Sequence, residues 1–162
     1  QSEGLAFADA LLRDHPDVVQ TRLMRADLNL TSTLAELLAG DIHKAWTAQL
    51  AQLEDLRISA PAFASRARWP RLGMRLPRTQ AVLRSLLVLA ADPSLARQAA
   101  TKLVGLATLA DQATNEAAAL ELRHGAVECL AAAKANGLPT AELAAAEFDS
   151  LRSLPAFQRL TQ

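Results

Sequence analysis

Apolar residues recur along most of this chain with the spacing of an amphipathic helix. Near the start, Leu5, Ala8 and Leu12 fall on one face, and Pro16 ends the stretch because the residue before a proline is pushed out of the α region. The same spacing predicts further helices over 17–38, 41–56, 78–91, 92–110, 113–135 and 138–151, and a short last turn over 155–160. The pattern therefore predicts helices from one end of the chain to the other.

Residues with strong preferences for helix ends separate these stretches. Gly40 takes the left-handed conformation that ends a helix without steric cost, and Asp41 is a good N-cap for the next helix. Asn136 and Gly137 mark a second turn between helices. Seven or eight helices joined by short turns predict an all-α fold of antiparallel hairpins stacked side by side, and Ala-rich helices can approach closely, as in an α-solenoid.

The composition also favours helix over strand. About half of the 162 residues are apolar, mostly Ala and Leu, and there is no Tyr. Ala and Leu lead the helix scale, whereas strands favour β-branched and aromatic side chains. This length suits a single domain, 1–162. Within it we expect helices over 1–57, an Arg/Pro-rich linker over 58–78, and further helical hairpins over 79–162.

The charges balance overall but not locally. The chain has 17 basic and 17 acidic residues, so no net field attracts a polyanion. From Arg57 to Arg84, however, seven arginines occur without an Asp or Glu. Within this arginine stretch we predict a partner-binding site made of Arg66, Arg68, Trp69, Arg71, Arg75 and Arg78.

Three interpretations of the arginine stretch remain open. It is a solvated linker with Trp69 as its anchor on the core, because unpaired charges do not enter a core. It binds an acidic protein or a small anion through the paired donors of guanidinium groups. Or it binds nucleic acid or lipid headgroups, with Trp69 stacking on a base. The zero net charge and the lack of a basic recognition helix disfavour nucleic acid.

No residue pattern predicts catalysis, a metal site or a cofactor. His15, His43 and His124 are far apart, and the one acid–histidine spacing, Glu121 with His124, is more typical of a surface pair. Cys129 lies in an apolar helical stretch and is expected to be a small core residue. No nucleophile motif or glycine-rich phosphate loop occurs, so we expect no enzyme. No apolar run is long enough for membrane insertion.

Three segments resemble tetratricopeptide repeats. In that family the first helix of a pair ends at Gly-Asp, and a small residue follows five positions after the Gly; Gly40, Asp41 and Ala45 match. The segment ALLRDHPD resembles the end of a repeat's second helix, where Pro16 matches. The end of the chain is similar to the terminal segment of many bacterial repeat regions at Phe148, Leu151, Arg152, Pro155, Phe157 and Leu160. The resemblance implies a degenerate, short tetratricopeptide-like α-solenoid.

Such repeat regions commonly sit at the C-terminal end of transmembrane serine/threonine protein kinases or of one-component regulators. The resemblance implies a non-catalytic domain that binds a protein or acidic peptide, or senses a ligand, for a larger bacterial signalling protein. We expect a periplasmic location if that protein spans a membrane and a cytoplasmic one otherwise. The alternatives are a stand-alone helical adaptor or inhibitor of a partner enzyme, and an anion or nucleic-acid binder that uses the arginine stretch. The partner and the oligomeric state stay open.

Overall fold

The computed structural model describes residues 2–16, 18–65, 67–90 and 92–162, and in these ranges it contains helices and turns but no strand. The α-helices are α1 (Ser2–Asp14), α2 (Val19–Ala39), α3 (Ile42–Ser59), α4 (Trp69–Gly73), α5 (Leu76–Ala90), α6 (Pro93–Gln112), α7 (Glu116–Ala135) and α8 (Pro155–Thr161). The 3-10 helices are η1 (Ala60–Phe63), η2 (Thr140–Ala144) and η3 (Ala146–Leu151). The all-α prediction is confirmed for the described part of the chain.

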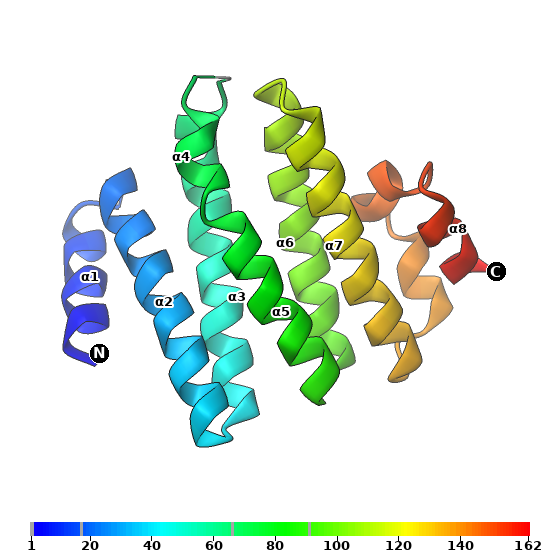
Figure 1. Cartoon of the computed structure of the whole chain (residues 1–162), viewed down its shortest axis with the longest axis horizontal. Coiled ribbons are helices and arrows are strands. Elements are labelled where there is room, and N and C mark those ends of the chain that lie inside the picture. Colours follow the sequence, from blue (N-terminus) through cyan, green and yellow to red (C-terminus); the bar gives the residue numbers. More distant parts are fainter. Residues whose placement is uncertain (1, 17, 66, 91) are drawn as a thin grey trace.

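The helices stand side by side in one row. In Figure 1 α1, α2, α3, α6 and α7 follow one another from left to right, and η2, η3 and α8 close the right-hand end. The helices α2 and α3 pack together as one antiparallel hairpin, α6 and α7 form a second, and α3 packs on α6 to join the two. The helix α5 crosses in front of α3 and also contacts α2 and α7. It therefore covers the junction between the hairpins on one side of the row.

The turn between α2 and α3 has the predicted geometry. Gly40 has φ 78°, which is the left-handed conformation, and the Asp41 side chain accepts a hydrogen bond from the backbone N–H of Lys44 at 3.1 Å. Backbone N–H groups of Gly40 and Asp41 donate to the carbonyl groups of Leu37 and Glu36. Ala45 is fully buried at the start of α3, where only a small side chain fits.

The turn between α6 and α7 repeats this geometry with different residues. Thr114 has φ 54°, and the Asn115 side chain caps α7 by accepting from the N–H of Ala118. The N–H groups of Thr114 and Asn115 donate to carbonyl groups three and five residues earlier, as Gly40 and Asp41 do. Ala119, five residues after Thr114, is fully buried. The sequence pattern places this break a few residues early, between 110 and 113, because Thr is rare at positive φ and does not mark a turn.

One hydrophobic core runs along the row from α2 to α8. Trp46 is buried, and its indole Nε1 donates to the carbonyl oxygen of Ala90 at 2.9 Å, which ties α3 to the end of α5. Leu53 is fully buried and Leu50 is half-buried. These three side chains form the inner face of α3.

The described residues between 58 and 78 form short helices that contribute side chains to the core. The prolines begin helices there instead of interrupting them, since Pro61 lies in the first turn of η1 and Pro70 in the first turn of α4. A proline at these positions removes no helical hydrogen bond, because the first N–H groups of a helix have no partner inside it. The buried side chains of this segment are Ala60, Phe63, Trp69, Leu72 and Leu76. The expected linker is thus corrected to a short helical connection.

Residues 138–151 also differ from the prediction of one helix. They form η2 and η3, and the residue before η2 is Pro139, with no capping side chain. Ala145 is extended between the two, at φ −58° and ψ 139°. Leu143, Phe148 and Leu151 are buried. Contacts of these apolar side chains with the core outweigh the helix propensity of the Ala-rich segment.

Candidate functional site

The residues of the predicted arginine site have different environments in the structure. Arg66 lies outside the described residues. Arg68, Arg71 and Arg78 are exposed, and within the described residues none of them forms an ion pair. Arg75 instead forms a bidentate pair with Asp27 of α2, with both nitrogen–oxygen distances at 2.9 Å. One predicted site residue is therefore a structural contact between the α4–α5 connection and α2.

Trp69 lies in the core. It is 1% exposed, against the expectation of a partly buried anchor, and no face of its ring is open for stacking on a base or a partner. It opens α4 and packs beside Gly73, whose Cα lies close to the indole. Trp69 is therefore removed from the candidate contact residues, and Arg68, Arg71 and Arg78 remain.

A groove runs beside the Arg75–Asp27 pair. Its floor is the outer face of α2, α1 forms one wall, and Arg75 forms the other. The lining residues are Phe7, Leu11, Gln20, Thr21, Met24, Asp27, Leu28, Thr31 and Arg75. The groove has a volume of about 510 Å³. We call it the α1–α2 groove.

The floor of the groove continues as an apolar stripe along α2. Met24, Leu28, Leu34 and Leu38 are four or six residues apart and project from one side of the helix. Met24 and Leu34 are exposed, and Leu38 is 91% exposed. Across the groove, Phe7 of α1 is 60% exposed. Contiguous apolar side chains open to solvent are typical of contact surfaces.

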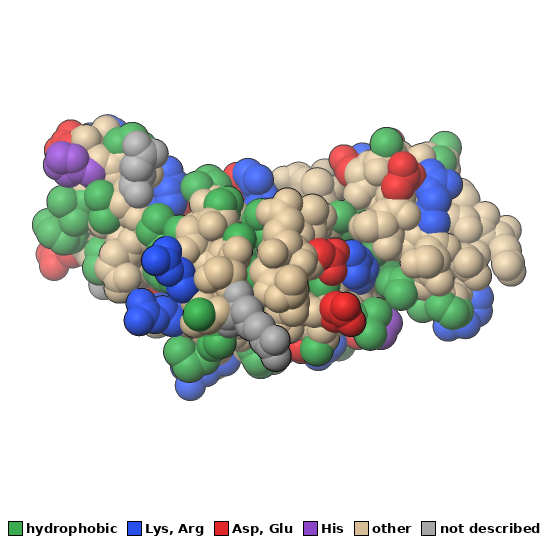
Figure 2. All heavy atoms as spheres, turned by 90° about the horizontal axis from the view of Figure 1, so that it is seen from above, with side chains coloured by type: hydrophobic (Ala, Val, Ile, Leu, Met, Phe, Trp, Pro, Cys, Tyr) green, Lys and Arg blue, Asp and Glu red, His purple; other side chains and the backbone are tan. Residues whose placement is uncertain are grey.

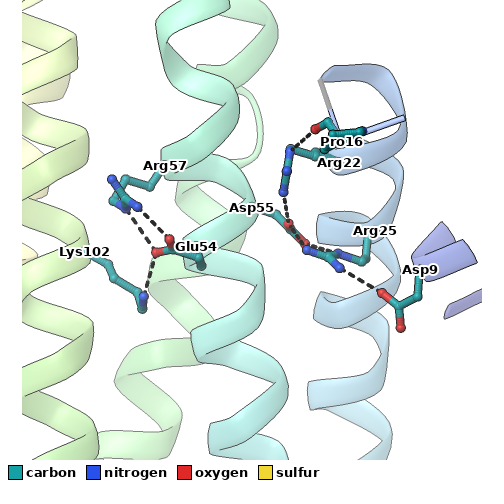
Figure 3. A network of polar contacts seen from close by, with 8 residues as sticks. All are labelled: Asp9, Pro16, Arg22, Arg25, Glu54, Asp55, Arg57 and Lys102. Atoms are coloured by element: carbon teal, nitrogen blue, oxygen red, sulfur yellow. Dashed lines mark hydrogen bonds and ion pairs between the residues drawn. The ribbon is translucent and has the colours of Figure 1, made fainter. Parts of the chain in front are cut away.

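Two ionic networks hold the row of helices together (Figure 3). Asp55 of α3 is fully buried and accepts two hydrogen bonds from Arg25 of α2, at 2.6 and 2.8 Å. Arg25 also pairs with Asp9 of α1 at 2.8 Å. The hydrogen bond with Asp55, and then that with Asp9, raise the pKa of Arg25 above its usual value. One guanidinium group thus joins three successive helices.

The neighbouring residue Glu54 points the other way, toward α6 (Figure 3). It accepts from Arg57 at 2.6 and 3.0 Å and from Lys102 of α6 at 2.6 Å. Hydrogen bonds from Arg57, and then from Lys102, lower the pKa of Glu54 to about 2. These three side chains line a shallow hollow with Thr101, Val104, Gly105 and Glu147.

The charged side chains around this hollow form ion pairs with one another. Arg97 of α6 pairs with Glu142 at 3.1 Å and with Glu147 at 3.0 Å, so the C-terminal segment is held in the same way. Figure 2 shows the molecule hollowed along one side between two raised ends, while Lys and Arg gather with apolar side chains at the lower left. A surface whose cations and anions neutralise each other offers little to a charged partner.

The remaining candidate groups show no arrangement for catalysis. His15, His43 and His124 are exposed on separate helices or turns. Burial raises the pKa of the Cys129 thiol to about 12, so it stays protonated and unreactive. Among the described residues no group of three or more His, Cys, Asp or Glu side chains is placed to hold a metal ion.

The α1–α2 groove was missed at the level of sequence. A signal was present, because residues 17–38 carry two apolar stripes, one for the core and one that includes Met24 and Leu38. The burial of Asp55 could have been predicted in a similar way, because Asp55 falls with Leu56 on the inner face of the helix over 41–56.

None of the described helices is both long and apolar enough to cross a membrane. No protein-family model, curated protein or solved structure matches this chain, and the surfaces described above carry the argument about function.

Proposed function

We propose that this chain is a non-catalytic helical-repeat domain that binds a protein or peptide through the α1–α2 groove. The observation that carries the proposal is the exposed apolar stripe on α2. The helix α2 packs on α1, α3 and α5, yet Met24, Leu34 and Leu38 on its remaining side face solvent. Covering them would remove apolar surface from water at roughly 25 cal/mol per Å².

The two equivalent turns support a tetratricopeptide-like, repeated architecture. Gly40 and Thr114 have the same backbone conformation, the next residue caps the following helix, and a buried Ala follows in both cases. The helix α1 packs on α2 as α3 packs on α6, which is the arrangement expected when one hairpin follows another. Helical repeats present extended surfaces to partners, so the architecture and the groove favour the same function.

Attachment to a bacterial signalling protein, such as a serine/threonine kinase or a one-component regulator, is part of this proposal. It rests on the resemblance of the Gly40-Asp41 turn and of the terminal segment around Phe148 and Phe157. In that setting the domain binds the signal-bearing protein or peptide, and the attached domain carries out the chemistry. The location follows the parent protein, periplasmic or cytoplasmic.

A random peptide-display library selected on the immobilised chain tests the proposal. We expect enriched peptides whose affinity falls at least tenfold for the double variant Met24→Ser/Leu38→Ser. The matched control is Val88→Ser/Leu89→Ser, which removes two exposed apolar side chains from α5 and leaves the affinity unchanged. Failure to enrich any peptide, or equal affinity for both double variants, would contradict the proposed function.

A further inference from the structure

We infer that the surface beneath α5 is a second binding site, which takes a basic amphipathic helix when α5 swings off the row. In this chain α5 itself occupies the site and acts as a built-in competitor. The inference goes beyond the proposed function, because this surface lies where α5 covers the junction of the two hairpins and not in the α1–α2 groove (Figure 1). Three features of α5 support it: the bonds that hold it, a buried amide without a partner, and the charges on either side.

The helix α5 is seated partly on polar side chains of α3. Gln52 Nε2 donates to Thr79 Oγ1 of α5 at 3.0 Å, and Gln49 Nε2 donates to the carbonyl oxygen of Thr79 at 3.3 Å. Trp46 holds the other end of α5 through the carbonyl oxygen of Ala90. Such bonds replace bonds to water, so each of them contributes little net stability to the docked helix.

A buried amide beneath α5 weakens the contact further. Gln80 is 3% exposed, and neither its Nε2 nor its Oε1 has a hydrogen-bond partner within the described residues. Gly125 of α7 lies beside this amide, where a Cβ would be 3.6 Å from Gln80 Oε1, but glycine has no side chain that could bond to it. In α3, Gln49 Oε1 is also buried without a partner. These atoms lose bonds to water when α5 docks and regain them when it opens, which disfavours the docked state.

The neighbouring helices carry no such buried polar groups. The buried side chains of α6 and α7 are all apolar. We therefore expect α5 to open as a local unit at a lower free energy than α6 and α7 unfold. Leu83 and Leu86 of α5 are buried in the common core, so opening exposes apolar surface that another amphipathic helix can cover.

Acidic side chains on both sides of α5 define the charge of the partner. Asp27 of α2 pairs at 2.9 Å with Arg75, the residue before α5, and Glu128 of α7 pairs with Arg84 at 2.7 Å. Both carboxylates are about half exposed, and both lose their arginine partners when α5 opens. A partner helix with an apolar stripe and two basic residues nine positions apart restores both pairs.

Hydrogen exchange of the unaltered chain tests the opening of α5. We expect the hydrogen-bonded amides of α5 to exchange at least tenfold faster than the slowest amides of α6 and α7. The variant Gln80→Met keeps the length of the side chain and removes its polar atoms. In this variant the α5 amides should exchange at least tenfold more slowly than in the unaltered chain.

A labelled peptide that copies residues 75–90 and carries Gln80→Met tests the site itself. Fluorescence anisotropy gives its dissociation constants for the unaltered chain and for the Gln80→Met chain. Because the peptide binds only the open state, Gln80→Met in the chain should weaken binding by the same factor by which it slows exchange of the α5 amides. Met24→Ser/Leu38→Ser, in the α1–α2 groove, should leave the binding of this peptide unchanged.

A second peptide tests the charge of the partner. It has the same sequence as the first but also carries Arg75→Gln and Arg84→Gln. We expect the peptide with both arginines to bind about fivefold more tightly at low ionic strength, and added salt to reduce this preference.

Two double variants of the chain assign that preference to the carboxylates beside α5. Asp27→Asn/Glu128→Gln should abolish it. The matched control Asp111→Asn/Asp149→Asn removes two exposed carboxylates that pair with arginines elsewhere in the chain, and it should keep the preference. The exchange and peptide measurements on the unaltered chain stand whether or not any variant folds.

Several results would overturn the inference. Exchange of the α5 amides as slow as that of α6 and α7, or no slowing in Gln80→Met, would show that α5 is a fixed part of the row. Equal binding of the two peptides would remove the basic character of the partner. Loss of peptide binding in Met24→Ser/Leu38→Ser would place the peptide in the α1–α2 groove. None of these outcomes depends on the display-library test, so the proposed function and this inference can fail separately.

Discussion

The hairpins α2–α3 and α6–α7 share one turn geometry but differ at several positions of their interiors. When Gly40 is matched with Thr114, five pairs of corresponding buried positions differ in the same direction, polar in the first hairpin and apolar in the second. These pairs are Asn29 and Leu103, Thr33 and Ala107, Gln52 and Ala126, Asp55 and Cys129, and Ser59 and Ala133. In the described part of the chain, every polar side chain that is buried lies between Asn29 and Gln80.

The difference shows two ways of holding a helical hairpin together. The second hairpin closes through small and branched apolar side chains, an interaction that has little directional preference. The first uses directional bonds, such as Gln49 Nε2 donating to Gln52 Oε1 and Gln52 Nε2 donating to Thr79 Oγ1, both at 3.0 Å. The second of these bonds joins α3 to α5, and each such bond contributes little net stability. The hairpin that carries the α1–α2 groove thus holds part of its interior by hydrogen bonds rather than by apolar contacts alone.

Breaking the buried ion pair between Arg25 and Asp55 should cause the largest loss of stability in the first hairpin. Arg25→Met leaves the fully buried Asp55 carboxylate without its bidentate partner, so we expect a loss of about 3–5 kcal/mol in the free energy of unfolding. Urea denaturation followed by circular dichroism measures it.

The double variant Arg25→Met/Asp55→Leu is the informative control. It gives the first hairpin an apolar contact like the one at Cys129 in the second, so most of the lost stability should return. A double variant as unstable as Arg25→Met alone would mean that the polar interior has no apolar substitute.

Enlarging the small residue after each turn should have the next largest effect. Ala45 and Ala119 are both fully buried, and Leu at either position overpacks the start of a helix against its neighbour. We expect each single variant to lose about 1–3 kcal/mol in a denaturant melt. Native-like stability for one and not the other would show that the two turns are not equivalent.

Exchanging the turn residues should have a smaller effect, of opposite sign in the two hairpins. Thr114 is β-branched and held at φ 54°, so Thr114→Gly should raise the free energy of unfolding by about 0.5 kcal/mol after the added freedom of the unfolded chain is counted. Gly40→Thr should lower it by about 1 kcal/mol. Calorimetric melting temperatures of the two variants check both signs; a stabilising Gly40→Thr would contradict the argument.

The ion pair between Glu54 of the first hairpin and Lys102 of the second should make the free energy of unfolding depend on pH. The pKa of Glu54 falls from 4.5 to about 2 in the folded chain, so its contribution is complete above pH 4.5 and is lost as the pH falls from 4.5 toward 2. Glu54→Gln removes this dependence. Stability of the two proteins, measured by urea unfolding at several pH values, should differ at pH 6 and converge near pH 2. A constant difference across this range would contradict the assigned role of Glu54.

The sequence predicted the helices better than it predicted the candidate binding site. The spacing predicts the long helices and the Gly40-Asp41 turn correctly, because local spacing and capping act within a few residues, but it misses η1, α4 and the division of 138–151 into η2 and η3. The arginine stretch was read as one site, but the structure buries Trp69 and pairs Arg75 with Asp27, far away in the sequence. Which arginines stay free depends on contacts between helices, and no local pattern contains that information.

The sequence by itself determined that the described part of this protein is helical and where most of its helices begin and end. Those properties follow from propensity, capping and the 3.6-residue period, which are local. Only the tertiary structure decided that α5 covers the junction of two hairpins, that Asp55 is neutralised by Arg25 rather than solvated, and that the second apolar stripe of α2 stays uncovered. Each of these depends on which helix faces become neighbours, and that is set by the packing of the whole row.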